Sequence, residues 1–175
     1  MTDRLPVIVL GATGMVGQRI VALLQNHPAL RISAVAASAR SAGTSYAEAT
    51  TWRLHGEMPS GVTNMPVLPC SPDAAPKGTR VALSALDGGV AGPIEAAFRD
   101  AGFAVVSNAS AWRMDPDVPL VVPEVNPEHL ALIDRQPGPG FIIANPNCCA
   151  IPLAMALAPL HRRWTVQAVT VATWQ

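Results

Sequence analysis

Two stretches of this sequence carry residues that could do chemistry, a cysteine pair around position 148 and a run of glycines near the amino terminus. Cys148 and Cys149 follow Asn147, which is a natural helix N-cap. The apolar stretch Ile151–Leu160 comes next and is typical of a helix. A thiolate at a helix N-terminus is stabilised by the helix dipole and by free backbone N–H groups. Because a thiolate attacks carbonyl carbon, and such N–H groups can hold an oxyanion, the pattern predicts Cys148 as a nucleophile.

The alternative for any free cysteine is that it is a small buried hydrophobe. We favour that interpretation for Cys70 and Cys149, and the local pattern around Cys148 leaves both open. Pro152 fits only the first turn of a helix, so it predicts that the regular helix begins one or two residues after Cys148. Three cysteines without a CxxC pair predict neither a disulfide framework nor a metal site.

The glycine run GATGMVG occupies residues 11–17, directly after the apolar stretch Val7–Leu10. A strand, a glycine turn and a helix in this order are typical of a dinucleotide site. Gly11 would allow the sharp turn, Gly14 the approach of a pyrophosphate, and Gly17 close packing of helix on strand. The spacing is GxxGxxG in place of the usual GxGxxG, so a tight turn without a ligand remains the alternative.

The residues after the second expected strand indicate which dinucleotide would bind. An NAD enzyme usually places an acidic residue about 20 positions beyond the glycines, on the ribose 2′-hydroxyl. Here Ser38, Arg40 and Ser41 stand in that region without a carboxylate. Hydroxyl groups and a guanidinium suit a 2′-phosphate, which predicts NADP as the cofactor. Judged alone, Arg40 could equally be a solvated loop arginine.

Short apolar runs alternate with stretches of helical spacing, and this alternation predicts an α/β fold with a mostly parallel, doubly wound sheet of the Rossmann type. The expected strands are Val7–Leu10, Ile32–Ala37, Val81–Ala85, Ala104–Ser107, Leu120–Val122 and Phe141–Ala144. The expected helices are Val16–Asn26, Val90–Ala101, Pro127–Asp134 and Cys149–His161. In the first helix, the residues expected to face the sheet are Val16, Ile20, Leu23 and Leu24.

Two segments fit this pattern less well. The stretch Ser41–Pro76 is rich in Ser, Gly, Thr and Pro, so we expect an insertion with a short helix or strand. The β-branched stretch Val166–Thr173 predicts a strand that ends two residues before Gln175. An edge strand so close to a terminus needs a pairing partner, and we therefore expect the chain to be part of a longer protein.

Composition narrows the class of protein. The chain has 175 residues, of which 50% are hydrophobic, with twelve basic and twelve acidic residues. Balanced charge provides no basic field for a phosphate backbone, so nucleic acid is an unexpected partner. No apolar run near the start is long enough for a signal peptide or a bilayer span. We expect a soluble cytoplasmic protein without a membrane partner.

Five stretches together resemble one known family, in the family's order and over nearly the whole chain. They are residues 11–18 (GATGMVGQ), 37–43 (ASARSAG), 107–116 (SNASAWRMDP), 122–129 (VPEVNPEH) and 145–148 (NPNC). On these motifs the sequence resembles the N-terminal part of aspartate-semialdehyde dehydrogenase, closer to the archaeal and fungal branch. The resemblance implies an NADP-binding Rossmann domain over residues 1–144 and the truncated beginning of a catalytic, dimerising domain over 145–175.

The family resemblance implies a reaction and the residues that serve it. The family reduces aspartyl 4-phosphate to aspartate semialdehyde with NADPH and releases phosphate, a step toward lysine, threonine and methionine. Cys148 matches the nucleophile, which would carry the acyl group as a thioester. Arg113 and Asn108 match phosphate-binding positions, and Gln175 matches the glutamine that orients the substrate. The cofactor cleft would be lined by Gly11, Thr13, Gly14, Met15, Val16, Ser38, Arg40, Ser41 and Ser84. Full-length relatives are expected to be homodimers or homotetramers.

The resemblance also marks what this chain lacks. The family's catalytic histidine and substrate-carboxylate arginine lie beyond the position of Gln175, so we expect the chain alone to have little or no dehydrogenase activity. N-acetyl-glutamyl-phosphate reductase and malonyl-CoA reductase share the same thioester chemistry and remain alternatives. A non-enzymatic NADP-binding module, with Cys148 unused, is the alternative from a different class.

Overall fold

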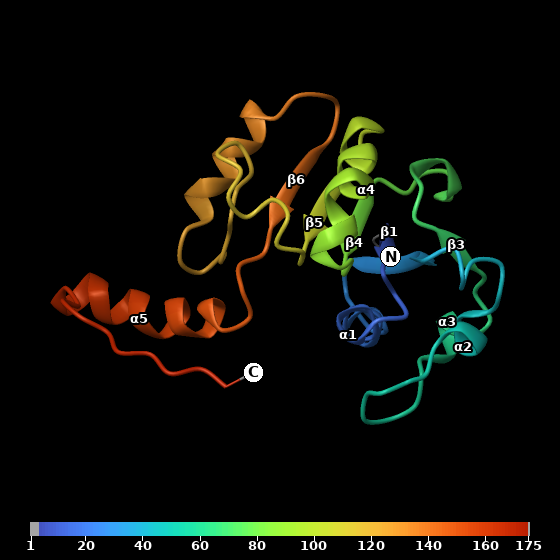
Figure 1. Cartoon of the computed structure of the whole chain (residues 1–175), viewed down its shortest axis with the longest axis horizontal. Coiled ribbons are helices and arrows are strands. Elements are labelled where there is room, and N and C mark those ends of the chain that lie inside the picture. The colour runs from blue at the N-terminus through green and yellow to red at the C-terminus, as the bar shows by residue number, and fades with distance from the viewer. Residues whose placement is uncertain (1–3, 175) are drawn as a thin grey trace.

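A six-stranded, all-parallel sheet forms the centre of the computed structural model, which describes residues 4–174 (Figure 1). Its strands are β1 (Leu5–Leu10), β2 (Leu30–Ala37), β3 (Val67–Pro69), β4 (Val81–Ser84), β5 (Ala104–Ser107) and β6 (Phe141–Ala144). They lie in the order β3-β2-β1-β4-β5-β6. Because the chain runs outward in one direction from β1 and then in the other from β4, the order reverses between these two strands. The predicted doubly wound fold is confirmed.

Helices cover both faces of the sheet. They are α1 (Met15–Leu24), α2 (Tyr46–Ala49), α3 (Ser60–Thr63), α4 (Gly88–Asp100) and α5 (Ala150–Trp164), with 3₁₀ segments η1 (Pro72–Ala74) and η2 (Pro127–Arg135). Successive residues of a strand point to opposite faces. Val7 and Val9 therefore join the core that contains residues of α1, α2 and α3, whereas Ile8 and Leu10 join the core that contains Phe98 of α4. Apolar cores on both faces are what a parallel sheet requires.

The face that α1 turns to the sheet differs from the predicted one. Its buried residues are Gly17, Gln18, Val21 and Leu24. Val16 and Leu23, which were expected to face the sheet, are half or more exposed. The reason is steric, since α1 lies so close to the end of β1 that only the side bearing Gly17 fits against it. The prediction was right for Leu24 and wrong for Val16 and Leu23.

The stretch expected to be an insertion, residues 41–76, contains short elements that complete the fold. Ser45 caps α2 through a reciprocal capping box with Glu48, and this Ser-x-x-Glu spacing was a sequence signal for a helix start. The Glu48 carboxylate accepts hydrogen bonds from the side chain and the backbone N–H of Ser45. These bonds lower the pKa of Glu48, and the one from the side chain has the larger effect. The following strand β3 pairs with β2 at the edge of the sheet.

Three elements predicted after β5 differ in the structure. Leu120 makes one isolated parallel bridge with Ala144, where a strand was expected. The helix expected over 127–134 is a 3₁₀ helix. Residues 166–173, expected to be a strand, have no regular structure. A strand needs a neighbour with free backbone groups, and within residues 4–174 this segment has no ladder pairing.

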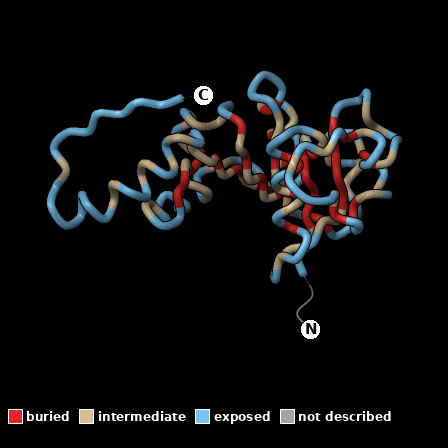
Figure 2. Tube along the Cα trace, turned by 90° about the horizontal axis from the view of Figure 1, so that it is seen from below, coloured by how far each residue is buried: buried red, intermediate tan, exposed pale blue. Residues whose placement is uncertain are grey.

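Burial divides the molecule into two parts. Among residues 4–174, the buried hydrophobic residues all lie between Val7 and Ala144, and α5 contributes none (Figure 2). In Figure 1, α5 and the segment after it extend away from the sheet. None of the helices in the described part of the chain combines the length and apolar character that a bilayer span demands.

Candidate active site

The carboxyl edge of the sheet is hollowed where the strand order reverses. A cleft of about 540 Å³ lies there, within the size range of ligand pockets. Its lining comes from the loops that follow four strands: β1, β2, β3 and β4. These residues are Gly11, Thr13, Gly14, Ala37, Ser38, Ala39, Arg40, Pro69, Cys70, Ala85, Leu86 and Asp87, with Val90 and Ile94 of α4. A crevice at this position is where doubly wound sheets bind nucleotides.

The glycine turn at this cleft has a geometry that two of its glycines make possible. Gly11 has a positive φ of 71°, and a Cβ there would lie 2.6 Å from the carbonyl oxygen of Ala85. A Cβ on Gly17 would lie 2.2 Å from the carbonyl oxygen of Gly11 and 2.7 Å from the Cα of Ala12. Both contacts are with backbone, which cannot move aside easily. Gly17 therefore allows the close packing of α1 on β1 that the sequence predicted.

Backbone donors face the same cleft. The first N–H groups of α1 have no acceptor within the helix, and the helix dipole adds positive potential at this end. The N–H of Gly14 is used inside the turn, where it donates to the carbonyl of Gly11 (3.1 Å). An anion at this end of α1 would be bound by the remaining donors of the first turn.

Buried Tyr46 holds the glycine turn by a hydrogen bond from its side chain. Its hydroxyl donates to the carbonyl oxygen of Ala12 at 2.8 Å. The side chain is fully buried, and burial raises the pKa of Tyr46 to about 12. The phenol thus stays protonated and keeps donating to the backbone of the glycine turn at physiological pH.

A second, more polar cavity of about 370 Å³ adjoins the cleft. The two cavities share Thr13, Gly14, Ser38 and Arg40. The second one is also lined by Met15, Gln18, Ser41, Ala49, Thr51 and Arg53. Hydroxyl and guanidinium groups from the β2 loop thus lie beside the glycine turn, in the arrangement predicted for a 2′-phosphate.

Beyond β4, Asn108 joins three strand ends. Its N–H and its Nδ2 both donate to the carbonyl of Ser84, each at 3.0 Å. Its Oδ1 accepts from Nδ2 of Asn145 at 2.9 Å. The side chain of Ser84 is fully buried and accepts from the N–H of Leu86. Ser84, expected to line the cofactor cleft, therefore contributes its carbonyl to this network, and Ala85 and Leu86 form the cleft wall.

Arg113 holds the loops after β5 and β6 together. Its Nε donates to the carbonyl of Asn145 (3.0 Å), and its Nη2 donates to the carbonyl of Asn108 (2.9 Å). The loop that carries these residues is anchored in turn by Ser107, whose hydroxyl donates to buried Glu95 at 2.8 Å. The residues predicted to bind phosphate, Asn108 and Arg113, therefore contact each other, and both contact Asn145, which follows the strand that leads to Cys148.

Cys148 lies on the turn between β6 and α5 and is exposed. The regular helix begins at Ala150, two residues after Cys148, as Pro152 predicted. Asn147 was expected to be the N-cap. Cys149 takes that backbone position, and Asn147 Oδ1 accepts from its N–H at 2.8 Å while the Asn147 carbonyl accepts from Ala150. Asn147 thus accepts these N–H groups from a position two residues before the N-cap.

The remaining predicted residues are placed as follows. Met15 and Ser41 line the second cavity, and Val16 lies on the exposed side of α1. Gln175 lies outside the described residues. Cys70 lines the cleft and is partly buried, and burial raises the pKa of its thiol.

Two residues of this region were not assigned a role from sequence. Asn145 ties Cys148's loop to Asn108, and Gln18 is buried beside the glycine turn. A signal for Gln18 existed. A polar residue on the sheet-facing side of an otherwise apolar helix must find hydrogen-bond partners, and these partners mark a structural junction.

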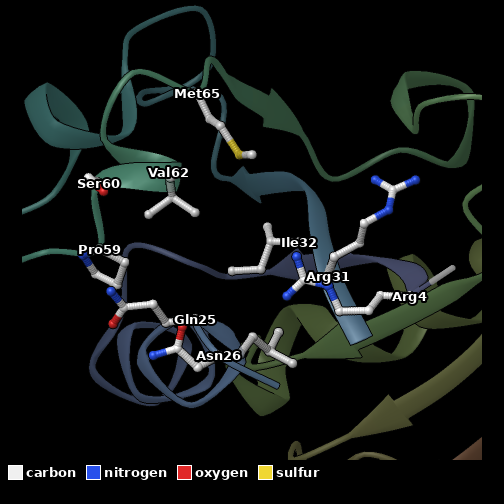
Figure 3. A pocket seen from close by; sticks show the side chains of 11 residues that line it. Arg4, Gln25, Asn26, Arg31, Ile32, Pro59, Ser60, Val62 and Met65 are labelled. Atoms are coloured by element: carbon white, nitrogen blue, oxygen red, sulfur yellow. The ribbon is translucent and has the colours of Figure 1, made fainter. Parts of the chain in front are cut away.

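Another hollow of about 330 Å³ lies at the opposite edge of the sheet, where the strands begin. Val62, Met65 and Ile32 point into it, between the end of α1, the start of β2 and α3 (Figure 3). None of the residues predicted to be functional lines it. Among residues 4–174, no cluster of three or more His, Cys, Asp or Glu side chains could hold a metal ion.

Comparison with known proteins gives a family match and close relatives. The family model described as semialdehyde dehydrogenase, NAD binding domain, matches residues 6–133. An aspartate-semialdehyde dehydrogenase of Methanothermobacter thermautotrophicus is 47% identical over 171 residues, covering 95% of this chain and 49% of the relative. A malonyl CoA reductase (NADP) of Metallosphaera sedula is 36% identical and covers 100% of this chain and 50% of the relative.

The structural comparison agrees with the sequence comparison. The crystal structure of aspartate semialdehyde dehydrogenase with NADP from Candida albicans matches with a TM-score of 0.86 and 41% identity. The match covers 94% of this chain and 48% of that chain. The chain thus spans about half the length of the relatives it matches.

Proposed function

The chain belongs to the semialdehyde dehydrogenase family through its NAD-binding domain, and from that premise we propose that it is the cofactor-binding and nucleophile-bearing part of an NADP-dependent aspartate-semialdehyde dehydrogenase. The observation that carries the proposal is the convergence of three features at one edge of the sheet. The nucleotide cleft, the Asn108–Arg113–Asn145 network and the loop leading to Cys148 all follow carboxyl ends of the strands. Relatives with this name support the choice of reaction.

The residues of the cleft fit NADP. The end of α1 offers backbone donors and a favourable dipole to the pyrophosphate, and Ser38, Arg40 and Ser41 offer hydrogen bonds to a 2′-phosphate. The solved relative from Candida albicans is described with NADP. When bound, NADPH supplies the hydride that reduces an acyl group to an aldehyde.

In the proposed reaction the chain's own residues form and hold the acyl group. Sγ of Cys148 attacks the carbonyl carbon of aspartyl phosphate, the C–O bond to phosphate breaks, and a thioester and free phosphate result. Nε and one hydrogen of Nη2 of Arg113 already donate to backbone carbonyls, so Nη1 and the second hydrogen of Nη2 are the donors that would meet the departing phosphate. After reduction, the C–S bond breaks, aspartate semialdehyde leaves and the thiol of Cys148 is restored.

We further propose that residues 145–175 begin a second, catalytic domain. This segment follows the last strand of the sheet, contributes no buried residue from its helix, and carries Cys148 on its first turn. Gln175 remains a proposed substrate-binding residue.

Thiol labelling tests the proposal. We expect iodoacetamide at neutral pH to label Cys148 faster than Cys70, because Cys148 is exposed whereas burial raises the pKa of the Cys70 thiol. Aspartate semialdehyde should slow the labelling of Cys148 alone, because its aldehyde carbon adds reversibly to that thiol. Peptide mass spectrometry reads each cysteine separately, and the Cys148→Ser variant is the control. Labelling of Cys148 that aspartate semialdehyde does not change, together with binding of NADP, would instead support a non-catalytic NADP-binding module.

Malonyl-CoA reductase is a second candidate because a relative of that name matches the whole chain at 36% identity. A thioester substrate would transfer its malonyl group to Cys148 and release free coenzyme A. Incubation with malonyl-CoA followed by intact-mass measurement distinguishes the two candidates. A malonyl adduct that disappears in Cys148→Ser would favour malonyl-CoA reductase, and no adduct would favour the aspartate enzyme.

A further inference from the structure

Buried Gln18 ties residues 51–53 to the glycine turn. Its Nε2 donates to the carbonyl of Thr13 at 2.9 Å and to the carbonyl of Thr51 at 3.1 Å. Its Oε1 accepts from the N–H of Arg53 at 2.9 Å. Gln18 is 1% exposed, whereas Thr51 and Arg53 are exposed, so the bonds are partly buried and join a buried side chain to a surface segment. One amide side chain thereby fixes the backbone at Arg53 relative to the turn.

This connection places Arg53 on the polar cavity beside the nucleotide cleft. Arg40 from the β2 loop and Arg53 from the loop after α2 both line that cavity, together with the hydroxyl residues Ser38 and Ser41. None of its lining residues is acidic, whereas the larger cleft includes Asp87. Two guanidinium groups without a neighbouring carboxylate form a site for a dianion.

We propose that Arg53 is a second cationic determinant of cofactor specificity, which binds the 2′-phosphate opposite Arg40, and that Gln18 is the residue that positions it. The inference rests on the proposed NADP-dependent function. It adds a contact from residues 50–53, a segment 40 positions beyond the glycines that sequence reasoning had placed in an insertion without a role.

The chemistry of the ligand supports this assignment. NADP differs from NAD by a phosphate in place of one ribose hydroxyl, and a phosphate carries close to two negative charges at neutral pH. One guanidinium leaves part of that charge without a partner. Because the side chain of Arg53 is exposed, solvent screens its contribution. We therefore expect Arg53 to change affinity by roughly fivefold, the size of a favourable exposed ion pair.

Binding measurements on this chain test the role of Arg53. Affinities for NADPH and NADH, and for the probes 2′,5′-ADP and 5′-AMP, are determined by calorimetry for the wild type, Arg53→Ala and Arg53→Lys. Arg53→Ala should weaken the binding of NADPH and 2′,5′-ADP roughly fivefold and leave the binding of NADH and 5′-AMP unchanged. Arg53→Lys, which keeps the positive charge, should retain most of the wild-type affinity. The matched control is Arg19→Ala, which removes an exposed arginine from α1 next to Gln18 but outside the cavity lining.

Each other outcome overturns a defined part of the inference. If Arg53→Ala weakens NADPH and NADH equally, Arg53 contacts the part common to both cofactors, and its role in specificity is wrong. If Arg53→Ala has no more effect than Arg19→Ala, the assignment is wrong while the proposed function stands. A wild-type chain that binds NADPH no better than NADH would overturn the proposed cofactor and this inference with it.

The positioning role of Gln18 has its own test. In Gln18→Leu, the ratio of NADPH to NADH affinity should fall, and adding Arg53→Ala to this variant should lower it no further. If Gln18 had only a structural role, Gln18→Leu would weaken the binding of NADPH and NADH equally and leave the ratio unchanged. That result would overturn the positioning role of Gln18. Circular dichroism confirms that the variant is folded, and Gln18→Glu, which keeps the acceptor, serves as a second variant if it is not.

Discussion

Helices α1 and α5 are both apolar and both follow a strand that ends at the candidate site, yet only α1 is built into the core. Four of its residues are buried, and its first turn is fixed by contacts with Gly11 and Ala12. Helix α5 is longer, at 15 residues against 10, and buries none (Figure 2). The contrast shows that an apolar sequence is enough to form a helix, whereas packing decides how much that helix contributes to stability.

The two halves of the candidate site differ in the same way: the nucleotide cleft adjoins the packed helix α1, and the nucleophile precedes the exposed helix α5. The nucleotide cleft is lined by loops whose backbone is held by buried side chains such as Tyr46 and Gln18. The nucleophile lies on an exposed turn that follows Asn145, which Asn108 and Arg113 hold by hydrogen bonds. Cofactor binding is therefore expected to survive changes in α5, whereas the reactivity of Cys148 depends on local order.

The largest expected effect comes from removing the same side chain from each helix. Leu24→Ala in α1 deletes a side chain that is 5% exposed and should cost about 3 kcal/mol of the free energy of unfolding. Leu160→Ala in α5 deletes one that is 44% exposed and should change it by less than about 0.5 kcal/mol. Urea unfolding followed by circular dichroism measures both. Equal losses would break the comparison.

A smaller effect is expected at the support of the glycine turn. Tyr46→Phe leaves the buried carbonyl of Ala12 without its donor and should cost about 1–2 kcal/mol at neutral pH. Cofactor affinity should fall with it, since the turn moves.

Tyr46 also predicts a pH dependence. Burial raises the pKa of Tyr46 to about 12, whereas an unfolded tyrosine ionises near 10. The contribution of Tyr46 to the free energy of unfolding is therefore complete below pH 10 and is lost as the pH rises from 10 to 12. The stability difference between wild type and Tyr46→Phe should narrow over that range. Tyr46 is the chain's one tyrosine, so phenolate absorbance follows its ionisation directly, and a titration near pH 10 in the folded protein would contradict the prediction.

The smallest effect is expected at the two helix starts that use side-chain caps. Ser45→Ala removes a cap from α2, which packs on the core, and should lower global stability by about 1 kcal/mol. Asn147→Ala removes the acceptor for the N–H of Cys149 and should leave global stability unchanged. Its effect should be confined to faster amide hydrogen exchange in the first turn of α5. A global loss equal to that of Ser45→Ala would show that α5 is coupled to the sheet.

Much of the nucleotide half could be predicted from sequence because its signals are local. Strands β5 and β6 have the predicted bounds, and the roles expected of Gly11 and Gly17 follow from backbone geometry that neighbouring residues impose. The sheet-facing side of α1 was mispredicted because an apolar stripe was weighted above the glycine that permits the contact. Residues 41–76 were predicted only as an insertion with a short helix or strand, because their helices are single turns with too few residues to show a period.

The sequence by itself determined the local features of the fold and the site. These are short apolar strands, a glycine turn, hydroxyl and guanidinium groups after β2, and a cysteine at a helix start. These depend on residue type and on neighbours within a few positions. Only the tertiary structure decided that Arg53 shares a cavity with Arg40, that Arg113 binds the carbonyls of Asn108 and Asn145, and that residues 166–173 remain unpaired. Such contacts join segments far apart in the chain, and they form only where the sheet brings strand ends to one edge.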